Sequence, residues 1–489
     1  MSKFYIPTTI ASLILLSGYY FYRFLKYYTY ATYKFNLVSL TVFLISVMLL
    51  ISLFFKFKIT SKTTFLIAFF ILSLISLVSH DFIVPYICAD CKMNILVGRR
   101  LKEQGFVNFL KNYHKPTLYK FKKRPELYQK LINYDNKFHL GYKKRLDIIE
   151  KEPPDVTLSD NREGTEAINW RIGKHSPFWF GIIWFIDSIT GENYFFKVVI
   201  PANIIAILYL VSVYRFVGLF YRDDEYKDKL FIPFIFLLSP AFLTQASQTT
   251  NDLALGILVI WLFLLLLKNN EHRITYKDLL SGFLYSIAVL CKFTSLALIP
   301  IIVLFYLIRF KRYGISKLLI FFLCFSILPL LLYITFNYDI ILNILTGSIE
   351  EFTLKSRVIK GKSIIETFLW YVFLEIYNFG IPIVLLLILH ILRIRKYITQ
   401  NEMLTTCLLA GYFLVLPYFF WGGGVSRHWL GFAPLIVSAL TYIYKNSVVK
   451  NKVFLSTIIL LLINNLLYLI HEGLIMAGYY QKHLKIMYW

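Results

Sequence analysis

Residues 251–267, NDLALGILVIWLFLLLL, form the stretch that decides the fold class. After Asp252, no charged residue occurs until Lys268, where the polar segment KNNEHRITYK (268–277) begins. The hydrocarbon core of a bilayer is about 30 Å thick, and a helix of roughly 20 apolar residues crosses it. The stretch therefore predicts a membrane-spanning helix that ends in a polar turn.

Similar apolar runs recur along the chain and predict an all-α polytopic membrane protein, with about 11–14 transmembrane or membrane-embedded helices. A further apolar segment, 176–188, is short for a full crossing. We expect N-terminal transmembrane helices over 1–86, a large polar loop over 87–175, and a transmembrane bundle over 176–489. The candidate spans lie near 4–22, 35–55, 64–86, 194–218, 229–245, 251–268, 277–293, 295–310, 317–336, 366–391, 402–420, 428–444 and 452–470.

The composition agrees with a membrane protein. Of the 489 residues, 58% are hydrophobic and 16% are charged, and the mean hydropathy is +0.62. Soluble domains are about 45–50% apolar and about 25% charged, so disordered, coiled-coil, collagen-like and ordinary cytosolic proteins are excluded. The net charge of +24 comes without the basic helix repeat or aromatic platform of a nucleic-acid-binding protein. We attribute it to basic loops beside the membrane.

Short basic loops predict the orientation, because Lys and Arg collect on the cytoplasmic side. The predicted cytoplasmic loops are 268–277, 309–317, 393–397 and 445–452. The polar turns 244–252, 337–365 and 421–429 then lie on the opposite side. If 176–188 crosses fully, the loop 87–175 is cytoplasmic. If it does not, this loop lies outside with the other polar turns.

The segment ADCKMNILVGRRLKEQG (89–105) places Asp90 after an apolar span and before a basic stretch that is amphipathic enough for a surface helix. With Arg99 and Arg100 nearby, Asp90 suits a general base acting next to a bound phosphate. A solvated loop charge is the alternative. Asp81 is a competing candidate, since an ionisable group at membrane depth is a functional hypothesis by default.

Three later segments carry further candidates. Lys174 and His175 precede Pro177 and an aromatic-rich run, where a Lys also serves as an interfacial anchor. Asp252 opens the 251–267 run, where it also suits a helix N-cap. Arg427 follows three glycines and either snorkels to the interface or binds a phosphate from the outer face.

The order of these segments resembles the GT-C superfamily of membrane glycosyltransferases, in the branch of protein O-mannosyltransferases and lipid A aminoarabinose transferases. That branch has an acidic residue after an early helix, then an amphipathic helix ending in Gly, as at Asp90 and Gly105. The family's later Lys/His-Pro-Pro, helix-opening Asp, helical Lys and Arg-Tyr-Leu landmarks are similar to the segments around Lys174, Asp252, Lys292 (VLCKF) and Arg427 (SRHWL). The usual acidic pair is Asp-Cys here, and the Pro-Pro pair is Ser-Pro.

The resemblance implies transfer of a sugar from a polyprenyl-phosphate-linked donor to an acceptor hydroxyl on the non-cytoplasmic face. It implies catalytic roles for Asp90 and Asp252, with His175 and Asp81 as further candidates. It also favours the loop 87–175 outside the cytoplasm and an incomplete crossing by 176–188. The cations expected at the donor phosphate are Lys174, Arg427, Arg99, Arg100 and Lys292.

Other functions remain open from the sequence: a transporter or flippase for lipid-linked sugars, and a glycan polymerase or ligase. A transporter would show internal repeats, which this sequence lacks. No metal cluster is evident, although a divalent metal stays possible. We expect the chain in the plasma membrane with an extracytoplasmic site, and the endoplasmic reticulum membrane is the alternative. The acceptor, whether protein, lipid or glycan, is open.

Overall fold

A computed structural model describes residues 177–189, 200–222, 225–237, 251–336, 402–421 and 426–445, with a few positions at 101–102, 105–107, 129, 133, 239, 242, 245–246, 363 and 365–366. Within these residues every regular element is a helix, as the sequence predicted. The predicted spans 4–22, 35–55, 64–86 and 452–470, most of 366–391, and nearly all of the loop 87–175 lie outside them.

The helices follow the predicted apolar runs closely. Their bounds are α10 Pro177–Ile189, α11 Ile200–Val217, α12 Tyr226–Leu237, α14 Asn251–Leu267, α15 Tyr276–Cys291, η2 Phe293–Leu298, α16 Ile299–Phe310, η3 Lys311–Tyr313, α17 Gly314–Phe336, α21 Glu402–Trp421, η4 Ser426–Gly431 and α22 Ala433–Lys445. The η elements are short 3₁₀ helices.

Prolines explain where the observed elements differ from the predicted spans. Helix α12 ends at Leu237 rather than near 245, because Pro240 disfavours helical backbone at the residue before it. Pro300 and Pro434 each occupy the second position of an α-helix, where no intrahelical donor is lost. The chain therefore enters α16 and α22 through the 3₁₀ turns η2 and η4 instead of through a continuous helix.

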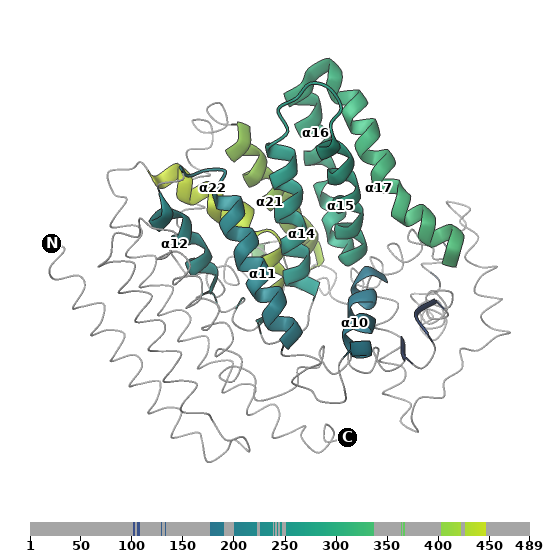
Figure 1. The fold of residues 1–489 in the computed structure, drawn as a ribbon. Helices are drawn as coiled ribbons and strands as arrows, with labels where there is room; N and C mark the ends of the chain where they lie inside the picture. Colours follow the sequence, from purple (N-terminus) through teal and green to yellow (C-terminus); the bar gives the residue numbers. More distant parts are fainter. Residues whose placement is uncertain are drawn as a thin grey trace, which may run out of the picture.

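Helix α14 lies at the centre of the described bundle (Figure 1). It packs against α11 on one side and α15 on the other, and it also contacts α22 and η4. Most of its side chains are buried, among them Val259, Ile260 and Phe263. The 251–267 stretch is therefore the core of the described bundle.

Helix α15 joins this core to α17 through aromatic packing. The ring of Tyr285 lies 5.7 Å from Phe321 and 5.2 Å from Phe325, centroid to centroid. Aromatic pairs at such separations add to the free energy gained by burial. On its other flank α15 contacts α10, the short segment that follows Lys174 and His175 in the sequence.

One helical stretch within the described residues, Phe293–Thr335, is long and apolar enough to cross a membrane, and an 18-residue window in it has a mean hydropathy of 2.6. It contains η2, α16, η3 and α17, and it turns back at η3 because α16 packs against α17 (Figure 1). Three shorter apolar helices are Pro201–Val217, Asn251–Leu267 and Glu402–Leu414.

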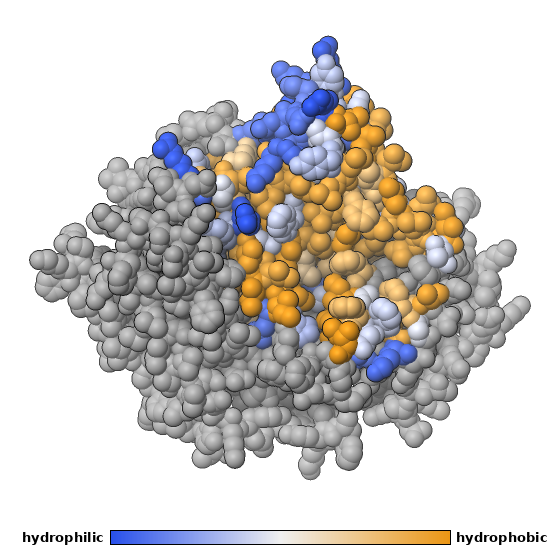
Figure 2. Space-filling view, in the orientation of Figure 1, coloured by the Kyte–Doolittle hydropathy of each residue, from blue (hydrophilic) through white to orange (hydrophobic). Residues whose placement is uncertain are grey.

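The outer face of α17 is apolar and uncovered. Leu319, Leu323 and Ile334 are 66%, 63% and 71% exposed. Figure 2 shows hydrophobic residues continuing from α17 over neighbouring elements, with hydrophilic residues gathered above them. A helix that is hydrophobic all round needs an apolar medium on its open side, so this face suits lipid.

The two ends of α14 and α15 differ in their polar contacts. At one end, the 268–275 turn meets the start of α17, where Lys317 binds Asp278 and the carbonyl of Arg273. At the other end, residues 251–252 meet residues 291–292. The predicted cytoplasmic loops 268–277 and 309–317 therefore lie together at one end of the described bundle, and the predicted site residues Asp252 and Lys292 lie at the other.

Candidate functional site

Asp252 and Lys292 form an ion pair between two neighbouring helices. Asp252 lies in the first turn of α14, and Lys292 is the residue directly after α15. The ammonium Nζ of Lys292 donates to Oδ1 of Asp252. The Asp252 side chain is 3% exposed, whereas the Lys292 side chain is 17% exposed. Asp252 is therefore buried in the core, whereas the side chain of Lys292 is partly exposed.

The backbone around Lys292 is held by a second contact from α14. Lys292 adopts an extended conformation (φ −159°, ψ 120°) that ends α15 and leaves helix-end carbonyls without intrahelical donors. The Asn251 amide donates to one of these, the carbonyl of Cys291, at 3.1 Å. Asn251 and Asp252 thus hold Cys291 and Lys292 by adjacent contacts.

Contacts from the η2 side complete this support. The Ser295 hydroxyl donates to the Lys292 carbonyl at 2.9 Å, and the Tyr285 hydroxyl donates to the Ser295 carbonyl at 2.9 Å. These bonds fix the break between α15 and η2, and therefore the point from which the Lys292 side chain leaves the backbone. A cation fixed in this way is suited to bind an anion with little reorganisation.

The segment that contains Arg427 lies beside the same helix. Element η4 packs on α14, and a Cβ added to Gly256 would lie 2.7 Å from the Leu430 carbonyl oxygen. The Tyr209 hydroxyl donates to that carbonyl at 2.8 Å. Close backbone approach at Gly256 thus places the backbone of Arg427, three residues before Leu430, next to α14. The Arg427 side chain lies outside the described residues.

The end of the predicted amphipathic helix packs on α10. Leu101 is helical and fully buried, and Gly105 has a φ of 77° that favours glycine. Phe106 then stacks on Trp184 of α10, with 5.6 Å between ring centroids. The polar segment after Asp90 is therefore connected to α10, which itself contacts α15.

The structure brings together two of the predicted site residues, Asp252 and Lys292, and places the backbone of a third, Arg427, on the same helix. The remaining candidates lie outside the described residues, and their roles stay predictions: Asp81, Asp90, Arg99, Arg100, Lys174 and His175.

Sequence reasoning missed the pairing of residues 251–252 with residues 291–292, which are 40 positions apart. It also missed a second, fully buried ion pair between Asp278 and Lys317 at the other end of the bundle. A signal for Asp278 existed, because Thr275 and Asp278 have the spacing of a helix capping box. No local signal identifies its partner Lys317, which lies in a segment that reads as a basic loop.

Within the part of the chain that the structure describes, no group of three or more His, Cys, Asp or Glu side chains is placed to hold a metal ion. In the described site the acidic side chain of Asp252 is bound to Lys292. The described part of the site thus offers a buried carboxylate that binds a partly exposed ammonium group.

Comparison with known proteins gives one match. Residues 174–338 match the model of the dolichyl-phosphate-mannose-protein mannosyltransferase family. The match covers about a third of the chain and includes Lys174, His175, Asp252 and Lys292. It confirms the resemblance found in the sequence and the glycosyltransferase class that the resemblance implied. No curated protein and no solved structure matches the chain.

Proposed function

We propose that this protein is an integral-membrane enzyme that transfers a sugar from a polyprenyl-phosphate-linked donor to an acceptor hydroxyl on the non-cytoplasmic face. The family match supports the donor class, because the family is described by a dolichyl-phosphate-linked sugar. The apolar outer face of α17 supports a membrane position. We also propose that the chain crosses the membrane several times, that transfer occurs on its non-cytoplasmic side, and that individual residues have the roles given below.

The observation that carries this proposal is the Asp252–Lys292 pair. It lies inside the matched region, at the end of the buried helix α14, with its basic side partly open. The leaving group in such a transfer is a lipid phosphate, and a preorganised cation in a water-poor site stabilises it strongly. Lys292 has three N–H donors, so it can bind a phosphate oxygen while it stays bound to Asp252.

In this proposal Asp252 acts through Lys292. Its carboxylate is almost fully buried and already accepts the bond from the ammonium. We therefore assign Asp252 as a positioning residue that orients Lys292, rather than as a second base. Asn251 has a related part, because it fixes the carbonyl of the residue before Lys292.

The reaction is a direct group transfer. The oxygen of the acceptor hydroxyl attacks C1 of the sugar, and the bond from C1 to the phosphate oxygen breaks. The polyprenyl phosphate leaves with that electron pair, bound by Lys292 and by the predicted cations Lys174 and Arg427. The acceptor proton passes to Asp90 as general base. A sequestered, partly apolar site also limits competing transfer to water.

The test is transfer by the purified full-length protein in liposomes. We expect product from a polyprenyl-phosphate-linked sugar and none from soluble nucleotide-sugars. Transfer from nucleotide-sugars alone would contradict the proposal. Movement of the intact lipid-linked sugar between leaflets without transfer would instead indicate a flippase.

Replacing Lys292 by Met is expected to weaken donor binding by about ten- to hundredfold, since a hydrogen bond to a charged group contributes about 1.5–3 kcal/mol. Asp252→Asn should weaken binding less, because the ammonium remains but loses its orienting partner. The double variant should be less impaired than the two single effects added together, as expected for two groups that act as a unit. Binding of a fluorescent polyprenyl phosphate, together with the thermal unfolding midpoint, measures these effects. Additive losses would show that the two residues act separately.

Lys174→Ala and Arg427→Ala are each expected to raise the donor KM by about ten- to hundredfold if they also bind the phosphate. Lys102→Gln is the matched control, because Lys102 is exposed and takes no part in the proposal. Membrane insertion should be normal in all three variants. Unchanged donor affinity in both alanine variants would assign Lys174 and Arg427 to interfacial anchoring.

A further inference from the structure

Four basic side chains are exposed at the end of the bundle remote from Lys292. We call them the basic cap: Lys268, His272, Lys311 and Arg312. His272 joins its turn to η3, because its ring lies 5.8 Å from Tyr313 and 6.3 Å from Phe310. Figure 2 shows this end as the hydrophilic region above the apolar face.

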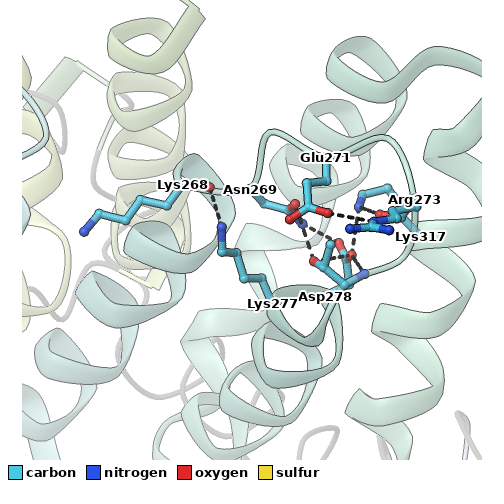
Figure 3. Close-up of polar contacts among 8 residues, drawn as sticks. Lys268, Asn269, Glu271, Arg273, Lys277, Asp278 and Lys317 are labelled. Atoms are coloured by element: carbon cyan, nitrogen blue, oxygen red, sulfur yellow. Dashed lines mark hydrogen bonds and ion pairs between the residues drawn. The ribbon is translucent and has the colours of Figure 1, made fainter.

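The other cations in these two turns have internal partners. Lys317 is buried against Asp278, and Lys277 donates to the Lys268 carbonyl at 2.8 Å (Figure 3). Arg309 donates to Asn270 Oδ1 at 2.6 Å. Arg273 pairs with Glu271 at 2.9 Å, and this contact lowers the pKa of Glu271, so its carboxylate stays ionised and neutralises Arg273.

The carboxylates of Glu271 and Asp278 are therefore already paired with Arg273 and Lys317. Residues 268–278 and 309–317 contain seven Lys or Arg residues but only two acidic residues, Glu271 and Asp278. Among the described residues, no carboxylate pairs with Lys268, Lys311 or Arg312. The basic cap thus keeps an uncompensated positive charge, which favours an anionic partner.

The turn that carries two of these cations has an unusual backbone. Lys311 has a φ of 49° and is the one non-glycine residue with positive φ in the described ranges. Such a conformation costs free energy in a residue with a side chain, and strained residues of this kind cluster at functional sites. Arg312 is held at the same turn by its stacking on Tyr313, 4.9 Å from the ring centroid.

The surroundings of the cap point to a membrane surface as the source of that anion. Large apolar or aromatic side chains are exposed next to it: Ile274, Tyr276, Ile308, Tyr313 and Ile315. Aromatic and basic residues mixed at the edge of an apolar band are typical of the headgroup level. A soluble anionic partner would not require these exposed apolar residues.

We propose that the basic cap binds the phosphate of anionic phospholipid headgroups in the leaflet next to this end, with Lys311 and Arg312 as the main contacts. The surface is separate from the site at Lys292, which lies at the other end of α15. The inference therefore does not depend on the proposed sugar transfer.

The test titrates the detergent-purified full-length protein with short-chain phosphatidylglycerol or phosphatidylcholine and counts bound lipid by native mass spectrometry. The test variant is Lys311→Gly combined with Arg312→Gln, since glycine tolerates the φ of residue 311 and the turn should still fold. Each basic residue near a headgroup contributes about fivefold in affinity, so the variant should bind phosphatidylglycerol about 30-fold more weakly. Lys102→Gln should bind it like the natural protein.

Three results would overturn the inference. The first is equal binding of phosphatidylglycerol and phosphatidylcholine by the natural protein, and the second is an unchanged preference in the double variant with a native unfolding midpoint. The third is displacement of phosphatidylglycerol by inorganic phosphate but not by chloride at matched ionic strength, which would indicate a free-phosphate site. Weakening of phosphatidylglycerol binding by either salt alike is the expected result.

Discussion

Asp90→Asn is expected to reduce sugar transfer by about 10²–10⁴-fold, which is the usual contribution of general-base catalysis. The amide has nearly the same shape as the carboxylate but cannot accept the proton of the acceptor hydroxyl. Donor binding should persist, because the cations proposed to hold the phosphate are untouched. Single-turnover transfer and equilibrium binding of the polyprenyl phosphate separate these two effects.

The matched variants are Asp81→Asn and Asp252→Asn under the same assay. Asp81 lies nine residues before Asp90, near the predicted end of the 64–86 span, and its replacement should leave transfer largely intact. Asp252→Asn should act mainly on donor affinity, because this carboxylate is bound to Lys292. Near-normal transfer by the Asp90 variant, with loss in the Asp81 variant, would move the base toward the membrane.

The fold of the described part was largely predictable because membrane insertion leaves a strong signal in composition. The runs near 251–268, 277–293 and 402–420 correspond to α14, α15 and α21 within a few residues. The 3₁₀ entries η2 and η4 were not predicted, because hydropathy does not register how a proline at the second helical position changes the preceding turn.

Two residues of the candidate site could be named from the sequence, but the contacts between them could not. Asp252 could be named because a charge opens an apolar run, and Lys292 through a family resemblance. Their pairing depends on α14 and α15 packing antiparallel, so that the start of one meets the end of the other. The support by Asn251 depends on the helix break at Lys292, which is itself a tertiary feature.

Lys317 shows the clearest limit of the sequence reasoning. It belongs to the basic loop RFKRYGISK, in which the positive-inside rule gives every Lys and Arg the same weight for predicting the membrane orientation of the chain. In the structure it is fully buried, 4.5 Å from the centre of the Phe310 ring, and paired with Asp278 at 2.8 Å. Its burial follows from the position of α17 against α15, which no local pattern encodes.

Removing one partner of this buried pair should strongly destabilise the protein. Asp278→Asn removes the negative charge beside the buried Lys317 ammonium, whose other hydrogen-bond acceptor is the neutral Arg273 carbonyl at 2.7 Å (Figure 3). Breaking a buried ion pair from one side costs about 3–5 kcal/mol, and we expect the upper part of that range. The thermal unfolding midpoint in detergent should fall accordingly, and the yield of folded protein with it.

Lys317→Met should cost less, near the lower end of about 3–5 kcal/mol, because Asp278 keeps its other donors. Its Oδ1 accepts from the Asn269 amide at 2.7 Å, and its Oδ2 accepts from the Thr275 backbone N–H at 2.8 Å and hydroxyl at 3.0 Å. The double variant Asp278→Asn with Lys317→Met should recover much of the loss, since no unpaired charge stays buried. Glu271→Gln is the exposed control and should leave the midpoint almost unchanged. Equal losses in Asp278→Asn and in the double variant would show that packing, not the buried charge, sets the stability of this end of the bundle.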